Sequence, residues 1–288
     1  MIAGNIIKEV SQRVPGENLV GFIRLLNEKV RSIAMEFPWR HYESLSSIQI
    51  LAGVSTGTAV VENGAATVSF SDTLPEIVEA GWRFMTNGRM YDVDEVSGEK
   101  EIVITPEYEG ADNDEATYSL WKDTYSLPEK FVSYNKAVRS DTGEPLVEVP
   151  LVEYINASMA IGSTSYGKRM FPCIDDGKKF CFYGVDSVTG APSFRLVAQP
   201  QSDFMVNFYY RRFPVDATGP ASVIDAPSYL EDAIIRGMVV EFLKRSTTEK
   251  GVSPLLQVEA SGFKEAVATA RRIETSLTQA VVQGSWQL

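Results

Sequence analysis

The sequence predicts an α+β fold in which helices from both ends of the chain form a helical bundle platform, and this platform carries an inserted antiparallel β-sandwich or barrel. Two patterns lead to this prediction. Apolar residues recur at alternating intervals of four and three from Leu19 to Phe37, and a similar pattern begins near Ser228; both are typical of amphipathic helices. Between these regions, short runs of alternating apolar and polar residues are separated by Gly, Asn and Asp turns, as in antiparallel sheets.

The first helical region is expected within residues 1–46. Residues 5–14 favour a short helix, which Pro15-Gly16 ends. Residues 17–36 favour a longer helix, which ends before Pro38 because the residue that precedes a proline is disfavoured in helical conformation.

Residues 47–131 are predicted to form the β-sandwich or barrel module. Its strands are expected at residues 58–61, 66–70, 81–96, 102–104 and 118–121. The Asn87-Gly88 pair predicts a tight hairpin, because Asn and Gly tolerate the positive φ angles that such turns require.

Residues 132–225 are predicted to form a second β-rich region, with a short helix as an alternative at residues 151–159. Further strands are expected around residues 180–183, 194–198 and 204–213. Cys173 and Cys181 flank a turn in this region and are interpreted as reduced thiols on hairpin strands, with a cross-strand disulfide as the alternative.

Residues 226–288 are predicted to complete the helical platform. Ser228 and Glu231 have the spacing of a capping box, in which each side chain satisfies a free backbone N–H at the start of a helix. Residues 251–254 interrupt the pattern before a final helix, whose apolar stripe consists of Phe263, Val267, Ala270, Ile273 and Leu277.

Charge and hydropathy make nucleic-acid binding and membrane insertion unfavourable functions for this chain. The 288 residues include 27 Lys and Arg against 38 Asp and Glu, which gives a net charge of −11. A chain this acidic is not expected to bind nucleic acid through its phosphates, although DNA can slide past it without adhering. No apolar run is long enough for a membrane span and no signal peptide is recognised, so synthesis in the cytoplasm and no membrane contact are expected.

Residues that carry catalytic chemistry are sparse, and we expect no enzyme activity, no cofactor and no metal. The single histidine, His41, has no recognisable nucleophile partner, and phosphate-binding glycine loops are absent from the sequence. Asp92 and Asp94 share a strand face, which a solvated edge explains more simply than catalysis. The acidic segment 112–115 is likewise interpreted as a solvated loop, with a calcium site as the alternative.

Several segments together resemble the head-to-tail adaptor (connector) proteins of tailed bacteriophages. The resemblance lies in residues 37–45 (FPWRHYESL), 81–96 (GWRFMTNGRMYDVDEV), 125–131 (YSLPEKF) and 194–214 (FRLVAQPQSDFMVNFYYRRFP), followed by the closing helices from Ser228. The segments occur in the same order as in that family and extend over about three quarters of the chain.

The resemblance implies a structural virion protein, made in the host cytoplasm, that forms an oligomeric ring, usually of twelve copies, beneath the portal. Its partners are then the portal protein, further copies of itself, a tail nozzle or hub protein, and double-stranded DNA passing through the central channel. The helical platform and the C-terminal tail are expected to meet the portal through Phe263, Arg271, Arg272, Trp286 and Leu288. The β module is expected to meet the next tail component through Trp82, Asn87, Asp112 and Asp114.

Two other function classes remain open at this point. A carbohydrate- or receptor-binding β module of a phage tail is the first alternative, because aromatic residues gather on the predicted strands. A carboxylate-based hydrolase is the second, and it requires two acidic side chains facing each other in a cleft.

Overall fold

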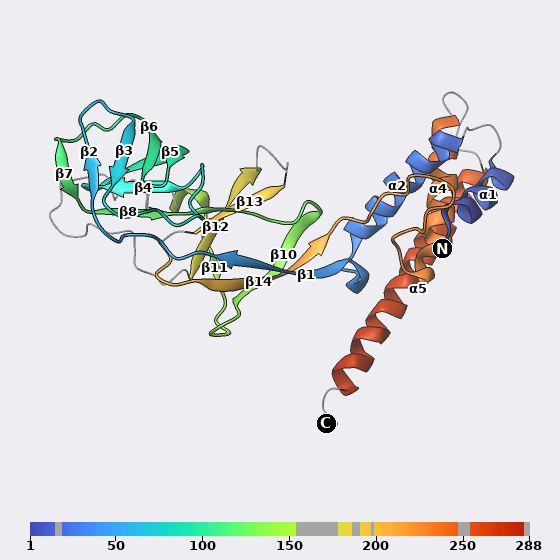
Figure 1. Ribbon diagram of the computed structural model, residues 1–288. Coiled ribbons are helices and arrows are strands. Elements are labelled where there is room, and N and C mark those ends of the chain that lie inside the picture. The colour runs from blue at the N-terminus through green and yellow to red at the C-terminus, as the bar shows by residue number, and fades with distance from the viewer. Residues whose placement is uncertain (15–18, 154–177, 186–190, 197–198, 247–253, 285–288) are drawn as a thin grey trace. The chain divides into compact units, whose positions relative to one another are not determined.

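The computed structural model describes residues 1–14, 19–153, 178–185, 191–196, 199–246 and 254–284 of the chain. It shows an α+β protein with helices and mainly antiparallel sheets (Figure 1). The chain divides into two compact units, a helical unit of Met1–Ser44 with Arg211–Leu288 and a β unit of Leu45–Tyr210. The helical unit resumes at Arg211, ahead of the predicted boundary at residue 226, because Arg211 and Arg212 both bind groups within it.

The helical unit is built around a central helix, α4 (Glu231–Ser246). α4 packs against α1 (Ala3–Arg13), α2 (Leu19–Glu36) and α5 (Pro254–Gly284). Because neighbours surround it, α4 buries side chains on most of its circumference rather than on one stripe. The core of the unit includes Ile6, Val10, Leu26, Ile33, Trp39, Ala233, Ile234, Met238, Val239 and Ala270.

The predicted helices at residues 5–14 and 17–36 are confirmed in type, with ends shifted by a few residues. The predicted capping box is wrong. Ser228 lies inside a 3-10 turn, η2 (Ser228–Leu230), which follows Pro227 and has no side-chain cap. Pro227 directs the chain into this turn, and α4 begins only at Glu231.

The first part of the β unit is a seven-stranded antiparallel sheet that curls into a nearly closed barrel (Figure 1). Its order along the sheet is β7-β2-β3-β6-β5-β4-β8. The strands are β2 (Ala59–Val61), β3 (Thr67–Phe70), β4 (Arg83–Thr86), β5 (Arg89–Gly98), β6 (Glu101–Thr105), β7 (Asn113–Ala116) and β8 (Tyr118–Trp121). The sheet encloses a core that includes Val61, Val68, Trp82, Phe84, Tyr91, Ile102, Ile104, Tyr108 and Leu120.

The two edge strands of this sheet are consecutive in the chain. Only Thr117 separates β7, which pairs with β2, from β8, which pairs with β4. The two edges of the sheet therefore meet at Thr117, and the Thr86 hydroxyl donates a hydrogen bond to the Thr117 carbonyl at 2.9 Å.

The predicted hairpin at residues 81–96 is confirmed. Asn87 and Gly88 have φ angles of 50° and 73°, and Thr86 pairs with Arg89 across the turn. Two successive positive φ angles define the tight turn that matches the twist of antiparallel strands.

The rest of the β unit consists of two smaller sheets. β1 (Glu43–Ile50), β14 (Phe204–Arg212) and β10 (Phe131–Arg139) form one, in the order β1-β14-β10. β11 (Val147–Glu148), β12 (Lys179–Val185), β13 (Pro192–Leu196) and β9 (Thr124–Ser126) form the other, in that order. Their common core is aromatic and includes Tyr125, Phe131, Phe180, Phe194, Phe204, Phe208 and Tyr210.

Of the alternative helix at residues 151–159, only residues 151–153 are described, and they are helical. Cys173 lies outside the described residues, whereas Cys181 is a buried free thiol on β12. Within the described ranges, no helix has the combined length and hydropathy needed to cross a bilayer.

Candidate functional site

Of the residues expected at a portal interface, two line one groove, one lies outside that groove, and two are not described. Phe263 and Arg271 line a groove of about 350 Å³ beside the end of α2, and Arg272 is exposed and does not line it. Arg271 already has partners within the chain, because its guanidinium lies 5.5 Å from the Phe37 ring centroid and 3.6 Å from a Glu36 oxygen. Trp286 and Leu288 lie outside the described residues.

An exposed apolar face on α5 was not recognised from the sequence. Val267 and Ala270 of the predicted stripe are buried, but Ile273 and Leu277 are 39% and 49% exposed. Leu255 and Val258, on the same side of the helix, are 47% and 64% exposed. α5 has 31 residues against 16 in α4 and extends past it toward the C-terminus (Figure 1), so the part of α5 around Leu277 has less cover from α4.

Polar side chains anchor α5 to the remainder of the helical unit. The Glu274 carboxylate, 3% exposed, accepts hydrogen bonds from the Arg40 backbone N–H at 2.8 Å and from the Tyr229 hydroxyl. Burial and this carboxylate raise the pKa of Tyr229 well above its usual value, so the hydroxyl remains a donor.

The Arg211-Arg212 pair stabilises the helical unit. Arg211 donates to the carbonyls of Ala34 and Phe37, where backbone acceptors at the end of α2 lack helical partners. Arg212 binds the Asp225 carboxylate with two nitrogens.

Asp225 also explains the position of the single histidine. His41 Nε2 lies 2.9 Å from Asp225 Oδ1, and the Val215 N–H donates to Oδ2 at 2.8 Å. Burial alone raises the pKa of Asp225, but hydrogen bonds from Arg212, Val215 and His41 outweigh it and hold the pKa well below the usual range. His41 is thus part of a carboxylate-centred network.

The residues expected to meet a tail component also differ in exposure. Trp82 is 0% exposed and packs in the barrel core, so it is not part of the exposed surface of the described chain. The reason is its position just before β4, from which the indole packs inward with Phe84. Asp114, on β7, is exposed.

Asn87 and Asp112 lie at one end of the barrel and are connected through Tyr108. The Asn87 side-chain amide donates to the Tyr108 hydroxyl at 2.8 Å, and this hydroxyl lies 3.2 Å from the Ala111 carbonyl oxygen. Asp112 accepts the Asn63 backbone N–H at 2.7 Å. Both side chains therefore hold turns together at this end of the barrel.

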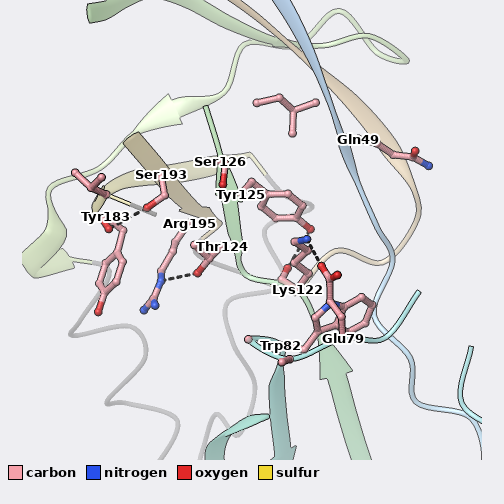
Figure 2. A pocket seen from close by; sticks show the side chains of 14 residues that line it. Gln49, Glu79, Trp82, Lys122, Thr124, Tyr125, Ser126, Tyr183, Ser193 and Arg195 are labelled. Carbon is pink, nitrogen blue, oxygen red and sulfur yellow. Dashed lines mark hydrogen bonds and ion pairs between the residues drawn. The ribbon is translucent and has the colours of Figure 1, made fainter. Parts of the chain in front are cut away.

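A large cleft lies in the β unit, between the segment before β4 and strands β9, β12 and β13. Its volume is about 640 Å³ (Figure 2). Sequence reasoning did not find it, because its walls come from segments far apart in the chain. The lining side chains that carry polar atoms include Gln49, Glu79, Trp82, Lys122, Thr124, Tyr125, Ser126, Tyr183, Ser193 and Arg195.

A buried carboxylate supports one wall of this cleft. Asp123, 2% exposed, lies 3.0 Å from Arg83 Nε and 3.8 Å from Arg195 Nε. Thr124 bridges the same groups, since its hydroxyl donates to Asp123 at 2.7 Å and accepts from Arg195 Nε at 2.9 Å. The Arg195 guanidinium also lies 3.3 Å from the centroid of the Tyr183 ring. This network holds Arg195 in one orientation on the wall.

The opposite wall carries an ion pair over aromatic rings. Lys122 Nζ lies 2.5 Å from Glu79 and 5.9 Å from the Tyr125 ring centroid. Figure 2 shows the Trp82 indole beside this ion pair. Burial raises the pKa of Tyr125 well above its usual value, and its hydroxyl donates to the Lys122 carbonyl at 3.0 Å.

Metal-ligating side chains do not gather in the described part of the chain, where no three His, Cys, Asp or Glu are placed to hold an ion. Asp92 and Asp94 are bound by Arg83 and Thr105, respectively. No family model matches this sequence, and no curated protein matches it.

Proposed function

We propose that this chain is a structural virion protein, a head-to-tail adaptor that assembles into a homo-oligomeric ring between a phage portal and the tail. The number of copies, twelve, comes from the resemblance. In this proposal the helices of the two chain ends form the platform of the ring, and the β unit meets a tail nozzle or hub protein.

The observation that carries the proposal is the exposed apolar face of α5. Four apolar side chains at 39–64% exposure lie on one side of a single helix, and such a face is typical of an interaction surface. A closed ring needs a heterologous contact in which this face meets a different surface of the next subunit or of the portal.

The charge of the chain agrees with passage of DNA through the ring. A net charge of −11 repels a polyanion, so DNA moves through the channel without adhering.

Negative-stain imaging of the full chain, alone and mixed with a portal protein, tests this proposal. We expect rings in at least one sample, and monomers in both would overturn it. Leu277→Glu places a charge on the exposed apolar face and should abolish the rings. Thr275→Glu is the matched control, because Thr275 is exposed on the same helix but outside that face, and its rings should persist.

A further inference from the structure

The cleft of the β unit has the size and composition of a ligand site. Its volume of about 640 Å³ falls within the range of about 300–1,000 Å³ that small-molecule sites occupy. Hydroxyl groups of Thr124, Ser126 and Ser193 line it together with the rings of Tyr125 and Tyr183. Hydroxyls beside aromatic faces suit a ligand that has both polar and apolar surface, as a sugar ring has.

One residue that lines the cleft, Trp82, has an unsatisfied donor. The Nε1–H group of Trp82 is fully buried and has no hydrogen-bond partner among the described residues. Such a group costs about 1–3 kcal/mol unless it finds an acceptor, and buried polar groups without partners are rare in native proteins. A ligand oxygen that enters the cleft can supply the missing acceptor.

The charged groups beside Trp82 are displaceable. The Glu79 and Lys122 side chains lie beside the indole (Figure 2) and are 60% and 30% exposed. An ion pair this exposed contributes only about 0–1 kcal/mol. A ligand can therefore separate the two side chains and form hydrogen bonds with both.

The opposite wall provides a fixed positive charge. Arg195 is 14% exposed, and Asp123, Thr124 and Tyr183 hold its guanidinium in place. A guanidinium held in one orientation is suited to bind a carboxylate. The surrounding chain is strongly acidic, which disfavours long polyanions but tolerates a ligand with a single negative charge.

We propose that this cleft binds an acidic saccharide, with the ligand carboxylate at Arg195, a sugar ring against Tyr183, and a ring or hydroxyl oxygen accepting from Trp82 Nε1. The site goes beyond the proposed ring function and does not depend on it. If the chain binds such a saccharide but forms no ring, the saccharide site stands and the adaptor proposal fails.

Binding is tested on the full chain by titration with 3′-sialyllactose and galacturonic acid, each with a single carboxylate, and with lactose as the uncharged comparison, followed by tryptophan fluorescence and calorimetry. We expect at least one acidic saccharide to bind, with an affinity at least about tenfold higher than that of lactose, the ratio expected for a charge-assisted contact. Absence of binding by both acidic saccharides overturns the proposal, as does equal binding of lactose.

Substitutions locate the site. Trp82→Phe keeps an aromatic ring but removes the N–H, so affinity should fall about three- to tenfold, the value of one hydrogen bond, and the smaller ring also costs some packing in the barrel core. Tyr183→Leu should weaken binding, whereas Tyr209→Leu is the matched control because Tyr209 is similarly exposed, at 47% against 38%, and does not line the cleft. Unchanged affinity in both Trp82→Phe and Tyr183→Leu overturns the assignment.

Discussion

Two glycines at the contact between α4 and α5 allow a sharp test of how closely these helices pack. A Cβ atom at Gly237 would lie 2.7 Å from Lys29 Cδ and 3.0 Å from Phe263 Cε2. A Cβ atom at Gly262 would lie 2.5 Å from Arg236 Nη1 and 3.1 Å from its Cζ. Both glycines occupy helix interiors, where alanine is more favourable by about 1 kcal/mol.

The neighbouring side chains decide whether each substitution raises or lowers the stability of the helical unit. Phe263 is a bulky ring packed against the core, which shifts less easily than a flexible side chain, and Lys29 is only 14% exposed. Overpacking of this kind typically costs about 1–3 kcal/mol, so Gly237→Ala should destabilise the helical unit by about 1 kcal/mol after the helix gain. Arg236 is 31% exposed, and a shift of its guanidinium toward solvent lengthens only a 3.4 Å contact with Glu259, so Gly262→Ala should leave stability unchanged or raise it by up to about 1 kcal/mol.

Urea denaturation followed by circular dichroism at 222 nm measures the stability of the helical unit in both variants, because most of the helix lies in that unit. The midpoint should move without a change in slope if only stability changes. A Gly237→Ala variant as stable as Gly262→Ala would show that the α4–α5 contact is looser than described, and would refute the reasoning.

Three further predictions concern single polar groups. Arg211→Met removes two hydrogen bonds to carbonyls at the end of α2 and should lower the free energy of unfolding by about 2–4 kcal/mol. The control, Arg24→Met, changes a side chain that is 79% exposed and should lower it by under about 0.5 kcal/mol in the same denaturation assay. The pKa of Asp225 is lowered on folding, so the stability that its carboxylate contributes is fully present above about pH 4 and is lost as the pH falls below that value. The difference in unfolding free energy between wild type and Asp225→Asn, measured by urea titration, should therefore become smaller in acid. A difference that stays constant with pH would contradict this sign. Burial raises the pKa of Cys181 to about 11. In a Cys173→Ser variant, a disulfide reagent at pH 8 should therefore label the Cys181 thiol much more slowly in the folded chain than in the urea-unfolded chain. Equal labelling rates would contradict the burial of Cys181.

Local patterns predicted the individual elements well. The Asn87-Gly88 hairpin and the helices at both ends follow from backbone preference and periodicity, which act within a few residues. The antiparallel strands of the barrel were expected in the correct region for the same reason.

Tertiary contacts account for what the sequence did not show. Alternation alone did not reveal that Trp82 packs into the barrel core, and periodicity alone placed Ile273 and Leu277 in the same buried stripe as Val267. Burial depends on which neighbours are long enough to cover a side chain. The cleft was also not predicted, because Lys122 and Arg195 are far apart in the sequence. They line the same cleft only once the barrel and the four-stranded sheet that contains β13 have folded.

The single residue between β7 and β8 has a consequence for synthesis of the chain. Strands β2 to β6 precede residues 113–121, and until this last segment emerges both edges of the sheet expose unpaired backbone groups. Unpaired edges invite association with other chains, and protein domains tend to fold as units during synthesis. A nascent chain that has emerged from the ribosome only as far as Asp112 therefore exposes the open sides of β2 and β4, and the next nine residues cover both with one continuous stretch of chain.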